Sequence, residues 1–266
     1  TGTGQLTLNI NNKKLVTGDK VIVTLPEGVQ YIYFTLSNRM SEALIYVPNG
    51  KFEYTVPSNM SQIFPKMVYS ADHQTITARI PTEAEVKEVQ NLSVNPYDTL
   101  NAKNTYPHAS ATNSHDENNA QFLIRNAIDG YTNNEAEHGD YPRQSWGPKQ
   151  NVTSTYTIDF GRKVDVSSFN IVLRGDFNEK DPSNGHDGGF TKAYAVLSDG
   201  TKKEFKINTT HATQTYTAKE IFGKDTVQTT SLKLELTPDQ NKWSALTEVQ
   251  VFGSNTEYSL PTKQRT

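Results

Sequence analysis

Apolar and polar residues alternate with a period of two through most of residues 5–80. The pattern is clearest at Leu6, Leu8 and Ile10, and again at Phe52, Tyr54 and Val56. Side chains of a β-strand point alternately to its two faces, so this period predicts strands with one buried face. Turn sequences such as Pro48-Asn49-Gly50 separate the runs. We therefore predict a small Ig-like β-sandwich over residues 1–90.

The second half of the chain also contains strand patterns, but they are separated by longer polar loops. Strands are predicted at 155–160, 168–173, 193–198, 203–207, 231–236 and 246–252. A short helix is predicted after Thr82, because Thr82 and Glu85 have the spacing of a capping box. Residues 91–105 are polar and lack periodicity, so we interpret them as the connection between two domains, and residues 255–266 as a tail. The fold class predicted is all-β.

Composition and charge exclude several classes of function. The net charge is −3 and no basic block occurs, so nucleic acid is not an expected partner. There is no cysteine, which excludes disulfides and thiolate metal sites. No apolar run approaches the roughly 20 residues that a membrane span needs. We expect a secreted or cell-surface protein whose signal segment lies outside the printed chain, and the sequence leaves its oligomeric state open.

Four segments of the second half carry a resemblance to a known family. In chain order they are Ala109-Ser110-Ala111, then Asn126-Ala127-Ile128-Asp129-Gly130 with Gln144-Ser145-Trp146-Gly147, then residues 156–161 (YTIDFG), then residues 246–253 (LTEVQVFG). Together they resemble the F5/8 type C, or discoidin-like, domain, which is the family 32 type of carbohydrate-binding module. The resemblance implies a galactose-binding-like jelly-roll β-sandwich over residues 106–254. It also implies a structural calcium ion and a ligand held by the loops at one end.

The segment that starts at Asp129 has the composition of a calcium site. Calcium binds six to eight oxygens from carboxylates, amides and carbonyls. Asp129-Gly130 places a carboxylate on a tight turn, and hydroxyl and amide oxygens follow at Thr132 and Asn134. The resemblance adds the backbone of Asn126 and the side chain of Glu248. The predicted ligands are therefore Asn126, Asp129, Thr132, Asn134 and Glu248; the alternative is that Asp129 only caps its turn.

A sugar has an apolar face and a fringe of hydroxyls, so its site needs an aromatic surface beside planar polar groups. The loops 138–146 and 174–190, and the segment that leads into Trp243, contain such groups. The candidate ligand-binding residues are His108, His138, Arg143, Trp146, Arg174, Asp176, His186 and Trp243. Two arginines, Arg143 and Arg174, point to an acidic sugar such as a uronate. Both tryptophans also fit a core position, and Arg174 with Asp176 fits a surface ion pair.

No reaction motif occurs in the chain, so we predict a carbohydrate-binding module without catalytic residues. Two other functions stay open. One is a polysaccharide-active enzyme in which His108, His138, Arg174 and Asp176 converge in one pocket for acid–base chemistry. The other is a cell-surface interaction scaffold. An aromatic pocket favours binding, a buried pair of titratable groups within hydrogen-bond reach favours catalysis, and a flat loop end favours a scaffold.

Overall fold

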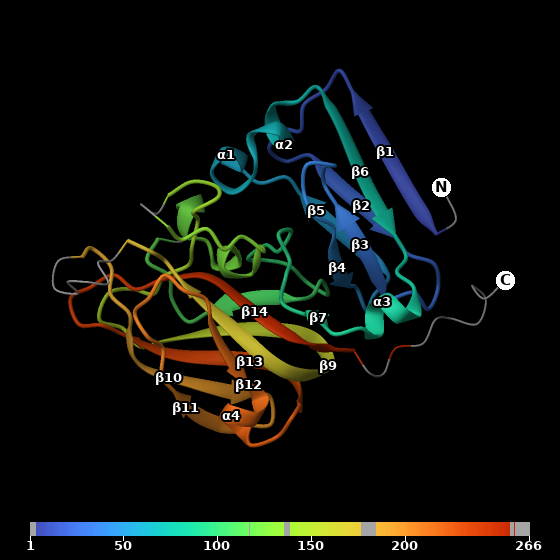
Figure 1. Cartoon of the computed structure of the whole chain (residues 1–266). Helices are drawn as coiled ribbons and strands as arrows, with labels where there is room; N and C mark the ends of the chain where they lie inside the picture. The colour runs from blue at the N-terminus through green and yellow to red at the C-terminus, as the bar shows by residue number, and fades with distance from the viewer. Residues whose placement is uncertain (1–3, 117, 136–138, 177–184, 256–257, 259–266) are drawn as a thin grey trace.

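A computed structural model describes residues 4–116, 118–135, 139–176, 185–255 and 258 of the chain. Within these residues most regular structure is antiparallel β-sheet, which confirms the all-β prediction. Two β-structured regions pack against each other, the N-terminal one above the C-terminal one in Figure 1. None of the described helices is both long enough and apolar enough to pass through a membrane.

The N-terminal region is a sandwich of two sheets. A four-stranded sheet has the order β1 (Gln5–Asn11), β6 (His73–Arg79), β3 (Tyr31–Thr35) and β4 (Ala43–Tyr46). A two-stranded sheet pairs β2 (Lys20–Thr24) with β5 (Lys51–Thr55). Buried and exposed residues alternate strictly along β5, as the sequence pattern predicts. The prediction of a buried face is wrong for β1, where Leu6 and Leu8 are exposed because β1 is the edge strand of its sheet. The two sheets meet at aromatic side chains, since the rings of Phe34 and Phe52 lie 4.6 Å apart.

Three short helices accompany this sandwich. The helix predicted after Thr82 is α3 (Glu83–Lys87), and its capping box is present, because Thr82 accepts from the Glu85 amide and Glu85 accepts from the Thr82 amide. The sequence analysis did not predict α1 (Met60–Ile63) and α2 (Lys66–Ser70). Each has only four or five residues, which is too short for a helical period to be visible in the sequence.

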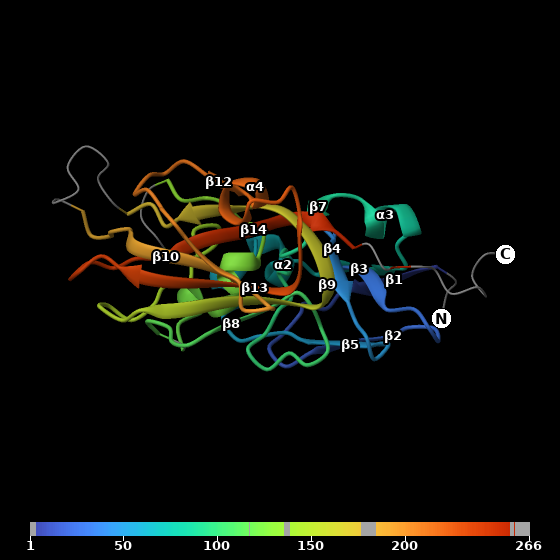
Figure 2. The same cartoon turned by 90° about the horizontal axis from the view of Figure 1, so that it is seen from below.

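The C-terminal region is a jelly-roll β-sandwich built around one long strand, β9 (Ser154–Leu173). The first half of β9 pairs with β8 (His108–Ala111) and β13 (Val227–Pro238). Its second half pairs with β12 (Gln214–Thr217) and β14 (Leu246–Ser254). Figure 2 shows β9 bending from one layer into the other. The remaining elements are β7 (Gln90–Asn91), β10 (Phe190–Leu197), β11 (Lys202–Phe205), α4 (Ala218–Phe222) and the 3-10 helices η1 (Ala120–Phe122) and η2 (Ile124–Ile128).

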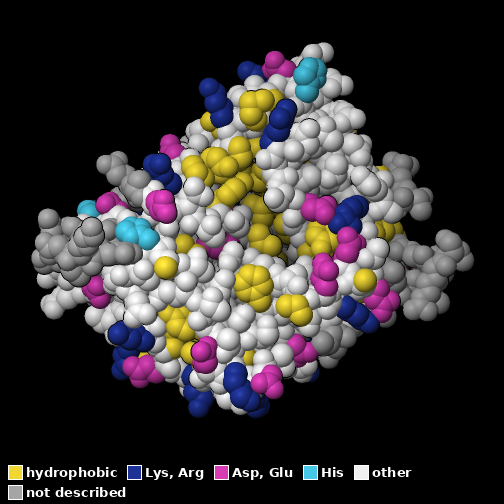
Figure 3. Space-filling view, viewed as in Figure 1, with side chains coloured by type: hydrophobic (Ala, Val, Ile, Leu, Met, Phe, Trp, Pro, Cys, Tyr) yellow, Lys and Arg dark blue, Asp and Glu magenta, His cyan; other side chains and the backbone are white. Residues whose placement is uncertain are grey.

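The segment 91–105, predicted to connect the two regions, is packed against both. Its amide at Asn95 donates to Ile128 O at 2.7 Å, and the Asn95 side chain donates to Pro107 O. Tyr97 is buried in the N-terminal core, where its ring lies 4.7 Å from that of Phe34. Figure 3 shows a strip of hydrophobic side chains where the upper and lower parts of the molecule meet. In the predicted tail, Tyr258 packs 4.8 Å from the ring of Tyr31.

Candidate functional site

One end of the jelly roll carries a hollow with a volume of about 280 Å³. Strand β9 ends there, β10 and β14 begin there, and β13 ends there. Its lining comes from the residues next to these strand ends and from the connection between β8 and β9. The hollow is concave, which fits a ligand site better than the flat end that a scaffold would show. It is lined by His115, Gln121, Phe122, Gly147, Pro148, Arg174, His186, Trp243 and Ser244.

Arg174, directly after β9, forms a two-point ion pair with Asp187. Nε of Arg174 lies 2.6 Å from Oδ2 of Asp187, and Nη2 contacts Oδ1. Both side chains are buried. The backbone holds Asp187 in place, because its amide donates to Asp176 O at 2.8 Å and the next amide donates to Trp243 O at 2.6 Å. The pair is therefore a fixed part of the wall rather than the exposed Arg174–Asp176 pair considered from the sequence.

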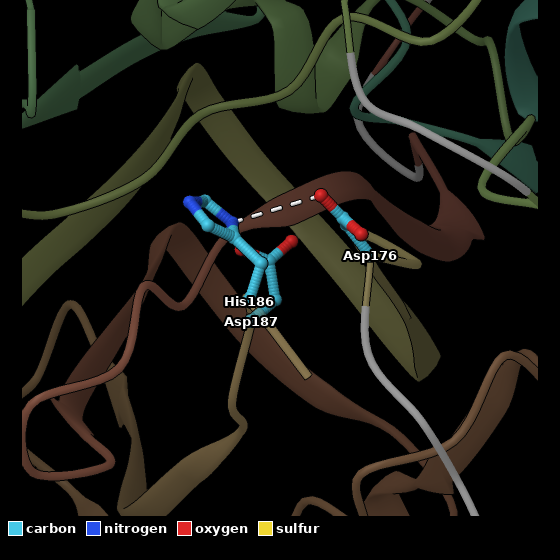
Figure 4. Close-up of side chains that lie close together, drawn as sticks. All are labelled: Asp176, His186 and Asp187. Atoms are coloured by element: carbon cyan, nitrogen blue, oxygen red, sulfur yellow. Dashed lines mark hydrogen bonds and ion pairs between the residues drawn. The ribbon is translucent and has the colours of Figure 1, made fainter. Parts of the chain in front are cut away.

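His186 and Asp176 lie beside this ion pair (Figure 4). Nδ1 of His186 is 2.9 Å from Oδ1 of Asp187 and 3.6 Å from Oδ2 of Asp176. These three side chains are close enough to bind a metal ion together. However, both oxygens of Asp187 already accept from the guanidinium of Arg174, and a cation there would be repelled by that guanidinium. The arrangement therefore favours a hydrogen-bonding network over a metal centre.

Aromatic side chains also line the hollow. The half-buried ring of Trp243 lies 4.2 Å from the imidazole of His115, and that imidazole lies 5.5 Å from the ring of Phe122. The guanidinium carbon of Arg174 is 5.7 Å from the Phe122 ring centre. His115, Phe122 and Gln121 were not predicted from the sequence. They belong to a polar, aperiodic stretch, and the only signal for them was its position just before the segment that resembles the family.

The structure brings together half of the predicted ligand-binding residues. Arg174, His186 and Trp243 line the hollow, and Asp176 is next to His186. His138 lies outside the described residues. Arg143 is exposed in a turn in which its amide donates to Asp140 O, and it does not line the hollow.

The prediction of a ligand contact at Trp146 is wrong. Its side chain is fully buried, and its Nε1 donates to the Ser114 hydroxyl at 2.9 Å. Its backbone pairs with Leu246 on β14, and its ring packs 4.8 Å from that of Tyr156. These contacts fix Trp146 in the core of the jelly roll, where no ligand can reach it.

His108 also does not line the hollow. His108 lies on β8 and pairs with Asp159 of β9. The hollow lies at the opposite end of this stretch of β9, beyond Ser154. Its Nδ1 is 2.8 Å from Oδ1 of the buried Asp98, and this hydrogen bond raises the pKa of His108 above 6.5. The convergence of His108 with Arg174 that the enzyme hypothesis requires is therefore not found.

The predicted calcium site contains two buried carboxylates, Asp129 and Glu248. Asp129 follows η2, and its Oδ1 accepts from the Tyr131 amide at 3.0 Å. Its Oδ2 accepts from Nε2 of Gln144 at 2.9 Å and lies 3.3 Å from Nη2 of Arg125. Oε1 of Glu248 accepts from the Gly130 amide at 3.1 Å. The turn at Asp129-Gly130 is thus hydrogen-bonded to the closing strand β14.

Burial shifts the protonation of both carboxylates. It raises the pKa of Asp129 to about 7, against a smaller opposing effect of the Arg125 charge. It also raises the pKa of Glu248 well above its usual range, and the charge of Asp129 adds to this increase. Two carboxylates face a single buried guanidinium, so one negative charge is left without a counter-charge unless a proton or a cation is bound.

Several buried oxygens around these carboxylates lack a hydrogen-bond partner among the described residues. They are Oε2 of Glu248, Oδ1 of Asn126 and Oε1 of Gln144. Oxygens of this kind are what calcium binds, so the residues present fit the ion. Gln144 was not predicted as a calcium ligand, although it belongs to one of the segments that carry the family resemblance.

Two of the predicted calcium ligands are not found at this place. Thr132 is exposed at the surface. The side-chain amide of Asn134 donates to Leu173 O at 2.8 Å and to His211 O at 3.0 Å. These hydrogen bonds join the loop to the end of β9. Asn126 is close to the carboxylates, but its side-chain amide donates to Ala120 O and Ser145 O.

No protein-family model matches this chain, and no curated protein matches it. Solved structures do match. The family 32 carbohydrate-binding module of NanJ from C. perfringens, in complex with galactose, is 18% identical and covers 54% of this chain and 91% of its own, with a TM-score of 0.38. A mutant lectin-binding domain of Lectinolysin, complexed with Lewis b, is 15% identical and covers 64% and 99%, with a TM-score of 0.43. The Streptococcus pneumoniae fucose-binding module SpX-3 is 13% identical and covers 65% and 99%, with a TM-score of 0.41.

Proposed function

We propose that the protein binds a carbohydrate in the hollow at the loop end of the jelly roll. The observation that carries this proposal is that the half-buried Trp243 and the buried Arg174 line the same hollow. An aromatic ring suits the apolar face of a sugar, and a fixed guanidinium suits its hydroxyls. The volume of about 280 Å³ is at the lower end for ligand pockets, which favours a terminal sugar residue over a long stretch of polymer.

A glycan array with the purified chain tests this proposal, followed by calorimetry on any glycan that binds. Trp243→Ala should lower the affinity by about tenfold or more, because it removes the apolar surface. Tyr194→Ala is a matched control, since Tyr194 is a partly exposed aromatic residue of β10 that does not line the hollow. Absence of binding to every glycan would contradict the proposal.

We further propose a structural calcium ion at Asp129 and Glu248. The support is the unpaired buried Oε2 of Glu248 and the excess of one negative charge in the cluster. Asp129, Glu248 and the side-chain oxygen of Gln144 would hold the ion, with Asn126 beside them. The ion would supply charge balance, and through it the loop after η2 would be tied to β14.

A polysaccharide-active enzyme is a second candidate, because one observation favours it. His186 lies 2.9 Å from the buried Asp187, inside the hollow, and a histidine oriented by a carboxylate is a common general base. Turnover of a polysaccharide that is lost in His186→Ala would support this function. Binding of the same glycan without any product would support the binding module instead.

A secreted or cell-surface location is our proposal for where this binding takes place. The cysteine-free composition is compatible with it, and polymeric glycans are found mainly outside cells. Fractionation of the producing cells with an antibody against the chain tests it, and recovery in the cytosol alone would contradict it.

A further inference from the structure

We infer that Asp187 is a specificity-determining residue, which makes the hollow select a neutral sugar over its uronic acid counterpart. This inference rests on the proposed carbohydrate function. It reverses the expectation of an acidic sugar that Arg143 and Arg174 suggested from the sequence. The reason lies in how Arg174 is paired and in where Arg143 lies.

The charge of Arg174 is already matched inside the wall. Asp187 accepts from both Nε and Nη2, which are the two nitrogens on one edge of the guanidinium. Arg174 is 6% exposed and Asp187 is 2% exposed, so solvent screens this pair only weakly. A carboxylate of a ligand could not form the same two-point contact, because that edge is occupied.

On Arg174, both N–H groups of Nη1 and the second N–H of Nη2 remain for a ligand. Nη1 has no hydrogen-bond partner among the described residues, on a side chain that lines the hollow. Arg174 thus presents a fixed donor whose positive charge is balanced by Asp187. Such a donor suits a hydroxyl or ring oxygen of a neutral sugar.

A uronate that contacts Arg174 would meet a guanidinium whose charge Asp187 already balances, so it gains little net attraction there. An ionised carboxylate loses its hydration in such a site, and without a free counter-charge this cost lowers its affinity relative to the neutral sugar. Arg143, the other arginine expected to attract an acidic sugar, is exposed and outside the lining, so it does not offset this cost. Asp187 also holds His186 by the 2.9 Å contact to Nδ1, so one carboxylate orients two side chains of the wall.

The test compares methyl glycosides that differ only at carbon 6: galactoside with galacturonide, and glucoside with glucuronide. Calorimetry on the wild-type protein should give an affinity for the neutral member at least about tenfold above that for the acid. Asp187→Asn keeps the shape of the side chain and removes its charge, so the ratio should shift toward the acid by about tenfold. Asp225→Asn, at a fully solvated position, is the matched control and should leave the ratio unchanged.

The outcomes separate this inference from the proposed function. Wild-type preference for a uronide, or an unchanged ratio in a folded Asp187→Asn protein, would overturn the role of Asp187. Absence of wild-type binding to all four probes and to the glycan array would contradict the carbohydrate function itself. If circular dichroism shows that Asp187→Asn does not fold, the wild-type comparison of each neutral and acidic pair still decides the inference.

Discussion

Asp129 should make the calcium-free protein less stable as the pH rises. Burial raises its pKa from 3.8 to about 7, so between these values the folded state holds a proton that the unfolded chain has released. Unfolding then releases protons, and the free energy of unfolding falls with increasing pH. Three pH units at about 1.4 kcal/mol each give a loss of about 4 kcal/mol. For a chain of this size that corresponds to roughly ten degrees in melting temperature.

A bound calcium ion should remove this dependence. The ion requires ionised carboxylates, so the proton on Asp129 adds no stability to the calcium-bound protein. Calcium therefore raises the free energy of unfolding most at high pH, where the calcium-free protein is least stable. The assay is thermal unfolding followed by circular dichroism from pH 4.5 to 8, once with a chelator and once with excess calcium. The two curves should converge near pH 5 and separate by about ten degrees at pH 8.

Two variants isolate the contribution of Asp129. Asp129→Asn should make the chelated curve less steep and abolish the response to calcium, whereas Asp225→Asn, exposed at the surface, should change neither. The raised pKa values of Glu248 and His108 act in the same direction, so part of the slope remains in Asp129→Asn. The difference between wild type and Asp129→Asn gives the share of Asp129 together with its effect on Glu248. Equal melting temperatures with and without calcium at pH 8 would refute the ion site. A melting temperature that rises between pH 5 and 7 in the presence of chelator would refute the raised pKa of the buried Asp129.

Further predictions concern the two tryptophans and the His108–Asp98 pair. Trp146→Ala should destabilise the fold by about 3–5 kcal/mol, measured by urea unfolding, because it empties a fully buried position. Trp243→Ala should change the melting temperature by only a few degrees while it lowers glycan affinity. A large loss of stability in Trp243→Ala, with a loss of glycan affinity but not of stability in Trp146→Ala, would contradict the placement of Trp146 in the core and Trp243 in the hollow. The raised pKa of His108 means that the stability from its pair with Asp98 is present below pH 6.5 and is lost as the pH rises through the folded value. His108→Gln should therefore lose less stability than wild type between pH 6 and 8 in urea unfolding, and an equal loss would contradict the pairing.

Period-two patterns were sufficient to predict most strands, but not the length of the longest one. Residues 155–160 and 168–173 read as separate strands because Gly161 interrupts the pattern. In the structure both belong to β9, and Gly161 has a φ of 65° within it. A Cβ there would lie 2.3 Å from the ring of Tyr106, so the glycine is needed for close packing rather than for ending the strand.

The site was harder to predict, because its residues are assembled by contacts between distant segments. Trp146 stands before the strand predicted at 155–160 and Trp243 before the closing strand, and composition does not separate them. Both pair through their backbones, Trp146 with Leu246 and Trp243 with Asp187. The difference is that the Trp146 side chain is fully buried, whereas that of Trp243 is half-buried in the loop before the closing strand. His115 reaches the ring of Trp243 from more than a hundred residues away, and no local pattern encodes such a contact.

The carboxylate cluster lies where the two sandwiches meet, which the family resemblance alone did not suggest. Nε2 of Gln144 bonds Asp129 and also lies 3.4 Å from Ile63 O in the N-terminal region. The guanidinium of Arg125 pairs with Asp129 and lies 5.5 Å from the centre of the Phe64 ring. A change of charge at Asp129 therefore acts on groups that contact both cores. This position explains why the balance of a single buried charge should affect the stability of the whole chain rather than that of one loop.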